Sequence, residues 1–135
     1  VLPALIRKVH EAKVAGAATV PVWGSGRPKR EFLHVDDLAD AVIFATRHYD
    51  GESHLNVGTG KDISIAELVS VIADVVGWEG EAVFDPNMPD GTPRKLLDVS
   101  ALADLGWTAQ TGLRDGIAET YAWFLDNVET VTASA

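Results

Sequence analysis

Apolar residues recur with helical spacing near the start of the chain, and they predict a helix over residues 3–13. Pro3 falls in its first turn, where a missing N–H costs nothing. At about 100° per residue, Lys8 lies on the flank of the apolar stripe and Arg7 lies roughly opposite it. We expect Lys8 to present its ammonium group at the edge of a cleft and Arg7 to face water. The stripe is Leu2, Leu5, Ile6, Val9 and Ala12.

Short alternating or apolar segments between the helical patterns predict strands. Pro21 lacks a donor for a sheet ladder, so the first of these strands is expected at a sheet edge. The segment "SHLNV" is followed by a glycine-rich turn, and "LLDV" is a short extended run after a proline-rich loop. The predicted strands are "TVPVW" (19–23), "EFLHV" (31–35), "SHLNV" (53–57), "EAVFD" (81–85) and "LLDV" (96–99).

Four further helices are predicted from periodicity and start signals. Ser64 and Glu67 form the S-x-x-E capping pattern ahead of "LVSVIADVV", which Gly77 is expected to end. Ser100 is expected to cap "ALADL", and Thr111 to open a last helix. The predicted inward residues are Leu38, Ala41, Val42 and Ala45 in "LADAVIFATRHY", and Leu113, Ile117, Tyr121, Phe124 and Val128 in the last helix. Alternating short strands and helices indicate an α/β chain.

Composition bounds the possible functions. The chain has 135 residues, 47% of them hydrophobic, which suits one compact unit. It carries 20 acidic and 11 basic residues, and the resulting formal charge of -9 argues against nucleic acid as a partner. The lack of cysteine excludes disulfides, thiolate metal sites and cysteine nucleophiles within the chain. No apolar run approaches the ~20 residues of a membrane span, and no signal-peptide pattern opens the chain, so we expect a cytoplasmic protein. The start at Val1, without methionine, suggests a piece of a longer protein.

Sequence motifs for catalysis or cofactor binding are weak. "WGSGRP" and "VGTGKD" each contain G-x-G, but Lys29 and Ile63 occupy the position of a third glycine, which favours turns over a dinucleotide loop. Asp36 and Asp37 could be paired acid–base carboxylates, but a helix start also uses acids, and we favour capping. A structural role is likewise favoured over catalysis for His34. No histidine cluster has metal-ligand spacing, and neither tyrosine is followed by lysine at +4.

A binding constellation remains. It consists of Lys8 on a helix flank, Trp23 at a strand end, Arg30 after a turn, and Asp90 with residues 94–95 in the loop "PDGTPRK". Arginine and lysine suit diphosphate oxygens, an exposed tryptophan suits stacking, and a carboxylate accepts sugar hydroxyls. The alternative is a solvated surface with a partly buried tryptophan. The residues alone leave both interpretations open.

Four stretches carry a resemblance to a known family: "VLPALIRKVHEAK", "VWGSGRPKREFLHVDDLADA", "LNVGTGKDISIAELVSVIADVVG" and "FDPNMPDGTPRKLLDVSALADLGW". They resemble the C-terminal half of the GDP-L-fucose synthase family, which are GDP-4-keto-6-deoxy-D-mannose 3,5-epimerase/4-reductases. "REFLHVDDLADA" is shared widely among extended short-chain dehydrogenase/reductases, whereas "VWGSGRPKREF" and "PDGTPRKLLD" are more particular to this family. The similarity covers the chain to about Asn127.

The resemblance implies that substrate binding and catalysis belong to different parts of the enzyme. The fold would be the C-terminal substrate-binding part of an extended, Rossmann-type NADP enzyme, and residues of about 31–60 would pack with the missing N-terminal domain. That missing domain would hold NADP(H) and every catalytic group, so the chain alone would be inactive, with no catalytic, cofactor-binding or metal residues of its own. The full-length enzyme would be a homodimer. The positions that match the family's GDP-sugar site are Lys8, Trp23, Arg30 and Asp90, with Lys95 as a neighbour on the diphosphate.

Two alternatives stay open at this point. The chain could come from another nucleotide-sugar epimerase or dehydratase of the same superfamily, with a different base or sugar. It could also be a non-catalytic nucleotide-sugar binding module.

Overall fold

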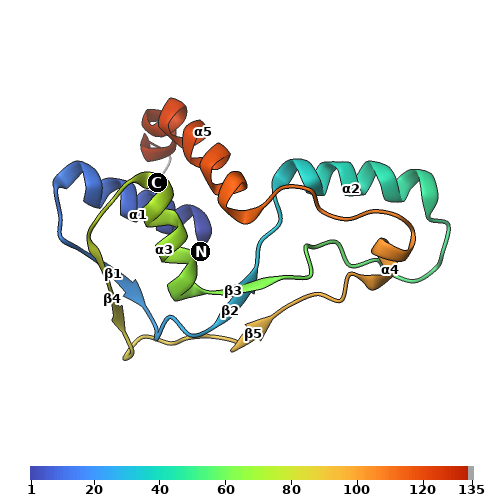
Figure 1. Ribbon diagram of the computed structural model, residues 1–135, viewed down its shortest axis with the longest axis horizontal. Helices are drawn as coiled ribbons and strands as arrows, with labels where there is room; N and C mark the ends of the chain where they lie inside the picture. Colours follow the sequence, from blue (N-terminus) through green and yellow to red (C-terminus); the bar gives the residue numbers. More distant parts are fainter. Residues whose placement is uncertain (134–135) are drawn as a thin grey trace.

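The computed structural model describes residues 1–133, and their side chains through Asn127 (Figure 1). Helices and short strands alternate along the chain, which confirms the predicted α/β class. The elements are α1 (Leu2–Ala15), β1 (Thr19–Trp23), β2 (Lys29–Glu31), α2 (Val35–His48), β3 (Asp62–Ser64), α3 (Ile65–Val76), β4 (Glu81–Asp85), β5 (Arg94–Lys95), α4 (Ser100–Asp104) and α5 (Leu113–Ala133).

The strands form two small sheets. β1 and β4 run parallel, with Trp23 opposite Asp85, so the loops that follow both strands leave from the same edge. In the second sheet β2 is central, pairing antiparallel with β3 and parallel with β5. Arg30 on β2 is in register with Ile63 on one side and Lys95 on the other. This sheet lies between the two ends of the elongated molecule (Figure 1).

The main core lies where α1, α3 and α5 gather around β1 and β4 (Figure 1). The predicted apolar faces of α1 and α5 are confirmed, apart from Val128, whose side chain lies outside the described residues. Both halves of the Ser64–Glu67 capping box form, and Gly77 ends α3 in the left-handed conformation. The cluster contains Leu5, Ile6, Val9, Ala12, Val20, Val22, Leu68, Val69, Ile72, Val76, Trp78, Ile117, Tyr121 and Phe124.

A second, much smaller cluster joins α2, α4 and the chain after α4. Its buried members are Ala41, Leu102 and Trp107. The predicted inward positions Leu38 and Val42 were wrong, because these side chains are 45% and 55% exposed. Within residues 1–133, no other element covers this side of α2.

Several strand boundaries differ from the predictions. The strand expected over 31–35 is β2 at Lys29–Glu31, because the chain already turns into α2 at Val35. Segments 53–57 and 96–99 are not strands, and the pairing partners of β2 are instead β3 and the two-residue β5. β3 and β5 are strands because they pair with β2, and the hydrophobic alternation within each segment did not reveal this pairing.

Two helix starts also differ. Ser100 does not cap α4: it is the first helical residue, and its N–H donates to Asp98 Oδ1 at 3.0 Å. This hydrogen bond lowers the pKa of Asp98. The last helix begins at Leu113, two residues after the predicted Thr111.

Candidate functional site

Lys8 and Trp23 meet beside the end of β1. The Lys8 ammonium donates to the Pro21 carbonyl at 3.2 Å and lies 5.9 Å from the centre of the Trp23 ring, within cation–π range. The Trp23 side chain is 68% exposed, so its ring is available to stack on a ligand. Arg7 instead pairs with Glu11 at 2.8 Å. The helix therefore places Lys8, and not Arg7, at the strand end, as its periodicity predicted.

Asp90 reaches from the loop after β4 to the loop after β1. Its Oδ1 accepts the Ser25 N–H at 2.6 Å, and its Oδ2 accepts the Ser25 hydroxyl at 2.8 Å. Both bonds, the backbone one foremost, hold the pKa of Asp90 below its usual value. Gly24 has a positive φ of 83°, and a Cβ there would lie 2.5 Å from Asp90 Oδ1. A side chain at residue 24 would therefore have to displace the Asp90 carboxylate.

Arg30 and Lys95 lie next to each other across the parallel β2–β5 pair. Arg30 Nη1 donates to the backbone carbonyl of Lys29 at 2.7 Å. Its Nη2 lies beside Gly91, because a Cβ added to that glycine would be 3.7 Å from it. Neither Arg30 nor Lys95 makes an ion pair within the described side chains. Like charges at paired positions repel, so an anion bound between them would relieve that cost.

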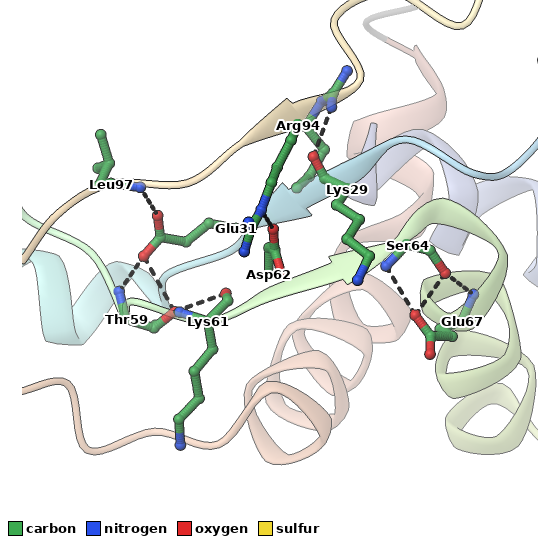
Figure 2. Close-up of polar contacts among 10 residues, drawn as sticks. Lys29, Glu31, Thr59, Lys61, Asp62, Ser64, Glu67, Arg94 and Leu97 are labelled. Carbon is green, nitrogen blue, oxygen red and sulfur yellow. Dashed lines mark hydrogen bonds and ion pairs between the residues drawn. The ribbon is translucent and has the colours of Figure 1, made fainter.

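Arg94, although adjacent to Lys95 in sequence, lies on the opposite face of the sheet. Its Nε pairs with the Asp62 carboxylate on β3 (Figure 2). This hydrogen bond lowers the pKa of Asp62 and raises that of Arg94. Strand alternation thus divides the basic pair: Lys95 shares the face of Arg30, and Arg94 is held by an acid.

The five predicted site residues therefore form one continuous surface. Lys8 contacts Trp23, Trp23 precedes Gly24, and Gly24 packs on Asp90. The following Gly91 borders Arg30, which is in register with Lys95. A hollow of about 230 Å³ opens between the two loops, lined by Arg27, Pro28, Asp90, Gly91 and Pro93.

Glu31 is a key residue that the sequence interpretation missed. Its Oε1 accepts the N–H groups of Thr59 and Gly60, both at 2.6 Å, and its Oε2 accepts the Leu97 N–H at 2.9 Å (Figure 2). A Cβ on Gly58 would lie 2.4 Å from the same carboxylate. The signal available in the sequence was the Gly-Thr-Gly turn, whose free N–H groups needed an acceptor.

The same contacts explain both G-x-G turns. In "VGTG" the backbone donors bind Glu31, and in "GSG" the Ser25 donor binds Asp90. A phosphate in either turn would have to displace a carboxylate. In both turns, a carboxylate from another segment of the chain therefore accepts the backbone N–H groups.

The capping interpretation of Asp37 was wrong in detail. This buried carboxylate accepts the N–H groups of Gln110 at 3.2 Å and Thr111 at 2.9 Å, so it ties the first turn of α2 to the segment before α5. A tertiary contact has replaced the local one. Asp36 lies exposed in the same turn and only complements the helix dipole.

His34 is not in a strand as predicted but at the N-cap of α2, where its side chain makes no capping bond. Its Nδ1 is buried without a hydrogen-bond partner in the described structure, and its Nε2 lies 3.5 Å from Glu119 Oε2. Gly116 packs against the imidazole ring, since a Cβ added to this glycine would lie 3.0 Å from His34 Cδ2. These contacts are with α5, and none of them involves one of the five site residues.

Neither a metal centre nor a membrane-spanning helix is present among the described residues. No group of three or more histidine, cysteine or acidic residues gathers there as metal ligands would. None of the helices in that part of the chain combines the length and hydrophobicity needed to cross a bilayer.

The sequence is similar to known proteins over most of its length. Residues 1–58 match the NAD dependent epimerase/dehydratase family. The chain is 57% identical over 128 residues to GDP-L-fucose synthase 1 of Arabidopsis thaliana, covering 95% of this chain and 40% of that protein. It is 52% identical over 136 aligned residues to GDP-L-fucose synthase of Escherichia coli K12, covering 94% and 42%.

Solved structures give the same result. A GDP-L-fucose synthetase from Naegleria fowleri bound to NADP has a TM-score of 0.89 at 32% identity, covering 96% of this chain and 41% of that one. The NADP-bound GDP-mannoheptose C4 reductase of Campylobacter jejuni has a TM-score of 0.84 at 37% identity, covering 92% and 44%. The resemblance to GDP-L-fucose synthases is confirmed, and the chain spans about two fifths of the length of these relatives.

Proposed function

Since this chain is homologous to one part of the GDP-L-fucose synthases, we propose that it is the GDP-sugar-binding portion of such an enzyme. The whole enzyme would be an NADP-dependent 3,5-epimerase/4-reductase that converts GDP-4-keto-6-deoxy-D-mannose to GDP-L-fucose. The observation that carries this proposal is the continuous surface formed by Lys8, Trp23, Arg30, Asp90 and Lys95, which come from four separate segments.

Each residue has a role that its chemistry supports. Arg30 and Lys95, adjacent and without ion-pair partners in the described structure, would bind the diphosphate. Trp23 would stack on a ring of the ligand, and Lys8 beside it would add positive charge. Asp90 is held ionised by Ser25 and would accept hydroxyl hydrogen bonds. An anionic ligand would be drawn to this surface locally despite the net charge of -9.

The chemical steps would take place in the rest of the enzyme. Two epimerisations next to the keto group, each through an enolate, would precede hydride delivery to the sugar. NADP(H) would supply that hydride from a site outside this chain, which is consistent with the carboxylates already bound in both G-x-G turns. This chain would contribute binding and orientation of the GDP-sugar, and by itself it would be inactive.

The arrangement of domains is part of the proposal. The exposed side of α2 presents Val35, Leu38, Val42 and Ile43, which are 68%, 45%, 55% and 50% exposed. The first three are spaced three and four residues apart and so share one helix face. We propose that residues of about 31–60 pack with a Rossmann-type domain through this face. Hydrogen exchange in α2 should slow when the NADP-binding part is present, and unchanged exchange would contradict this arrangement.

The cellular context follows the same resemblance. We propose that the full-length protein is a cytoplasmic homodimer with no metal requirement, and that its subunits associate through the part outside this chain. The absence of cysteine agrees with a reducing compartment. Light scattering of the protein expressed from its complete reading frame would show a dimer, and a monomer would contradict the proposal.

Calorimetric titration with GDP and with UDP tests the proposed ligand. The protein should bind GDP more tightly, and Arg30→Ala should weaken GDP binding by about 1.5–3 kcal/mol, the usual contribution of a charged hydrogen bond. Arg7→Ala is the matched control, since Arg7 pairs with Glu11 away from the site, and it should leave the affinity unchanged. A preference for UDP would favour another nucleotide-sugar epimerase or dehydratase.

The reading frame upstream of Val1 tests the enzymatic part of the proposal. It should encode G-x-x-G-x-x-G and Tyr-x-x-x-Lys, the motifs of NADP binding and hydride transfer in this superfamily. If both are missing, the chain would be a non-catalytic nucleotide-sugar binding module.

A further inference from the structure

Both oxygens of the Asp90 carboxylate are bound by one residue. The Ser25 amide donates to Oδ1 at 2.6 Å and the Ser25 hydroxyl donates to Oδ2 at 2.8 Å. A single bond would leave the carboxylate free to rotate about its terminal torsion, which is a soft one. Two bonds from a single residue fix the plane of the carboxylate.

The Ser25 hydroxyl also has partners on its other side. The backbone N–H of Arg27 lies 3.3 Å from Ser25 Oγ, and Arg27 Nε lies 3.2 Å from it. Because Arg27 can only donate, the hydroxyl accepts from Arg27 and its own proton is directed to Asp90. Hydrogen bonds therefore run from Arg27 to Ser25 and from Ser25 to Asp90. In such a chain, the bond from Arg27 strengthens the one that Ser25 donates to the carboxylate.

The carboxylate still has capacity to bind a ligand. Each oxygen has two lone-pair positions, and Ser25 uses one on each. Asp90 and Arg27 both line the hollow of about 230 Å³ between the loops. A ligand there would meet a carboxylate of fixed orientation with one acceptor position left on each oxygen, an arrangement suited to two hydroxyl groups.

We propose that Ser25 is a positioning residue of the GDP-sugar site, which sets the Asp90 carboxylate in the orientation that accepts ligand hydroxyls. This inference rests on the proposed function, and it adds a residue outside the five predicted from the sequence. Ser25 acts through Asp90 and does not itself bind the ligand.

A purely structural role for the Ser25 hydroxyl is less consistent with the contacts. The Gly24 N–H donates to the Asp85 carbonyl at 2.9 Å, and the Lys29 N–H donates to the Pro93 carbonyl at 2.9 Å, so backbone bonds already hold both loops. The Ser25–Asp90 contact is exposed, and exposed polar contacts of charged groups contribute little to stability. What the hydroxyl adds is the orientation of Asp90.

A double-mutant cycle read by calorimetry tests this proposal, with GDP-mannose as the probe and the protein from its complete reading frame. Ser25→Ala should weaken binding about three- to tenfold, the effect of one hydrogen bond. Ser25→Thr keeps the hydroxyl and should recover most of the affinity, because Ser25 lies outside the positive-φ region. In an Asp90→Ala background, Ser25→Ala should change the affinity by less than about twofold.

A carboxyl titration gives a second readout that a merely structural role would not move. The Asp90 pKa, followed by carbon-13 NMR, should rise toward its ordinary value in Ser25→Ala and stay low in Ser25→Thr, since the hydroxyl bond contributes to its depression. Thermal unfolding of every variant should match the parent within the error of the measurement.

The outcomes separate the two proposals. If the unmodified protein does not bind GDP-mannose, the proposed function fails. If it binds and Ser25→Ala retains full affinity, the positioning role is overturned while the proposed function stands. Equal loss of affinity with and without Asp90 would also overturn it, because Ser25 would then act on the ligand directly.

Discussion

The two ends of this molecule bury apolar surface to very different degrees. Around α1, α3 and α5 the described side chains close a large core, in which Val9, Leu68 and Ile72 are completely buried. Around α2 and α4 only Ala41, Leu102 and Trp107 are buried, and the apolar side of α2 faces outward. The first end is built around a closed core, whereas the apolar side of α2 at the second is the face that we propose packs with a further domain. The candidate site extends from α1 and β1 at the first end to the β2–β5 pair.

The largest expected effect comes from matched deletions in the two cores. Leu68→Ala should lower the free energy of unfolding by about 2–5 kcal/mol, because it leaves a cavity among fully packed side chains. Leu102→Ala removes the same atoms from an equally buried position in the small cluster, and it should instead increase hydrogen exchange in α2 and α4 alone. Equal loss of protection at both ends would show that the molecule is one cooperative unit.

Glu31 offers the next test, because its carboxylate joins β2 to the Gly-Thr-Gly turn and to the segment after β5. Glu31→Ala should cost about 1.5–3 kcal/mol of stability, since it leaves three backbone donors without their charged acceptor. Chemical denaturation would measure this cost. Glu31→Gln keeps one oxygen acceptor and should be milder; an equal cost would mean that the packing of the side chain matters more than its hydrogen bonds.

A third prediction concerns Asp37, which ties α2 to the segment before α5. Asp37→Ala should lower the free energy of unfolding by about 1–3 kcal/mol, because the carboxylate is buried and two N–H groups lose their acceptor. Affinity for GDP-mannose, measured by calorimetry, should change much less. A large loss of affinity with unchanged stability would place Asp37 in the site.

The smallest expected effect is a pH dependence at the centre of the molecule. Arg94 lowers the pKa of Asp62 in the folded state, so this pair stabilises the fold above the ordinary carboxyl pKa of about 3.9 and loses its contribution as pH falls through the depressed value. Arg94→Gln should therefore be less stable than the parent at pH 7 but not at a pH well below that range. A stability difference that persists in acid would mean that Arg94 acts through packing. Urea denaturation at both pH values would decide.

The sequence predicted the parts of the fold that local chemistry determines. The stripe of α1, the capping box of α3 and the flank position of Lys8 follow from residues close together in the chain. Arg94 and Lys95 could not be assigned to opposite faces, because β5 exists only through its pairing with β2. The partner of Asp37 lies more than seventy residues away, so a local cap was the natural prediction.

In the candidate site, too, the sequence indicated some residues and missed one whose role depends on a distant contact. The resemblance pointed to the five residues, and the structure places them on neighbouring segments. Ser25 was not identified, because a serine inside Gly-Ser-Gly looks like part of a turn. Its importance depends on a contact with Asp90, sixty-five positions further along the chain.

The contact between Gly24 and Asp90 has a practical consequence for protein engineering. A side chain at position 24 would need both a positive φ and space that the Asp90 carboxylate already occupies. Random libraries aimed at new sugar specificities should therefore keep Gly24 constant, since nearly every replacement there would strain the backbone and displace the Asp90 carboxylate. Arg27 borders the hollow with an exposed side chain, but its Nε donates to Ser25 Oγ, so substitutions there would also remove a donor that helps to orient Asp90.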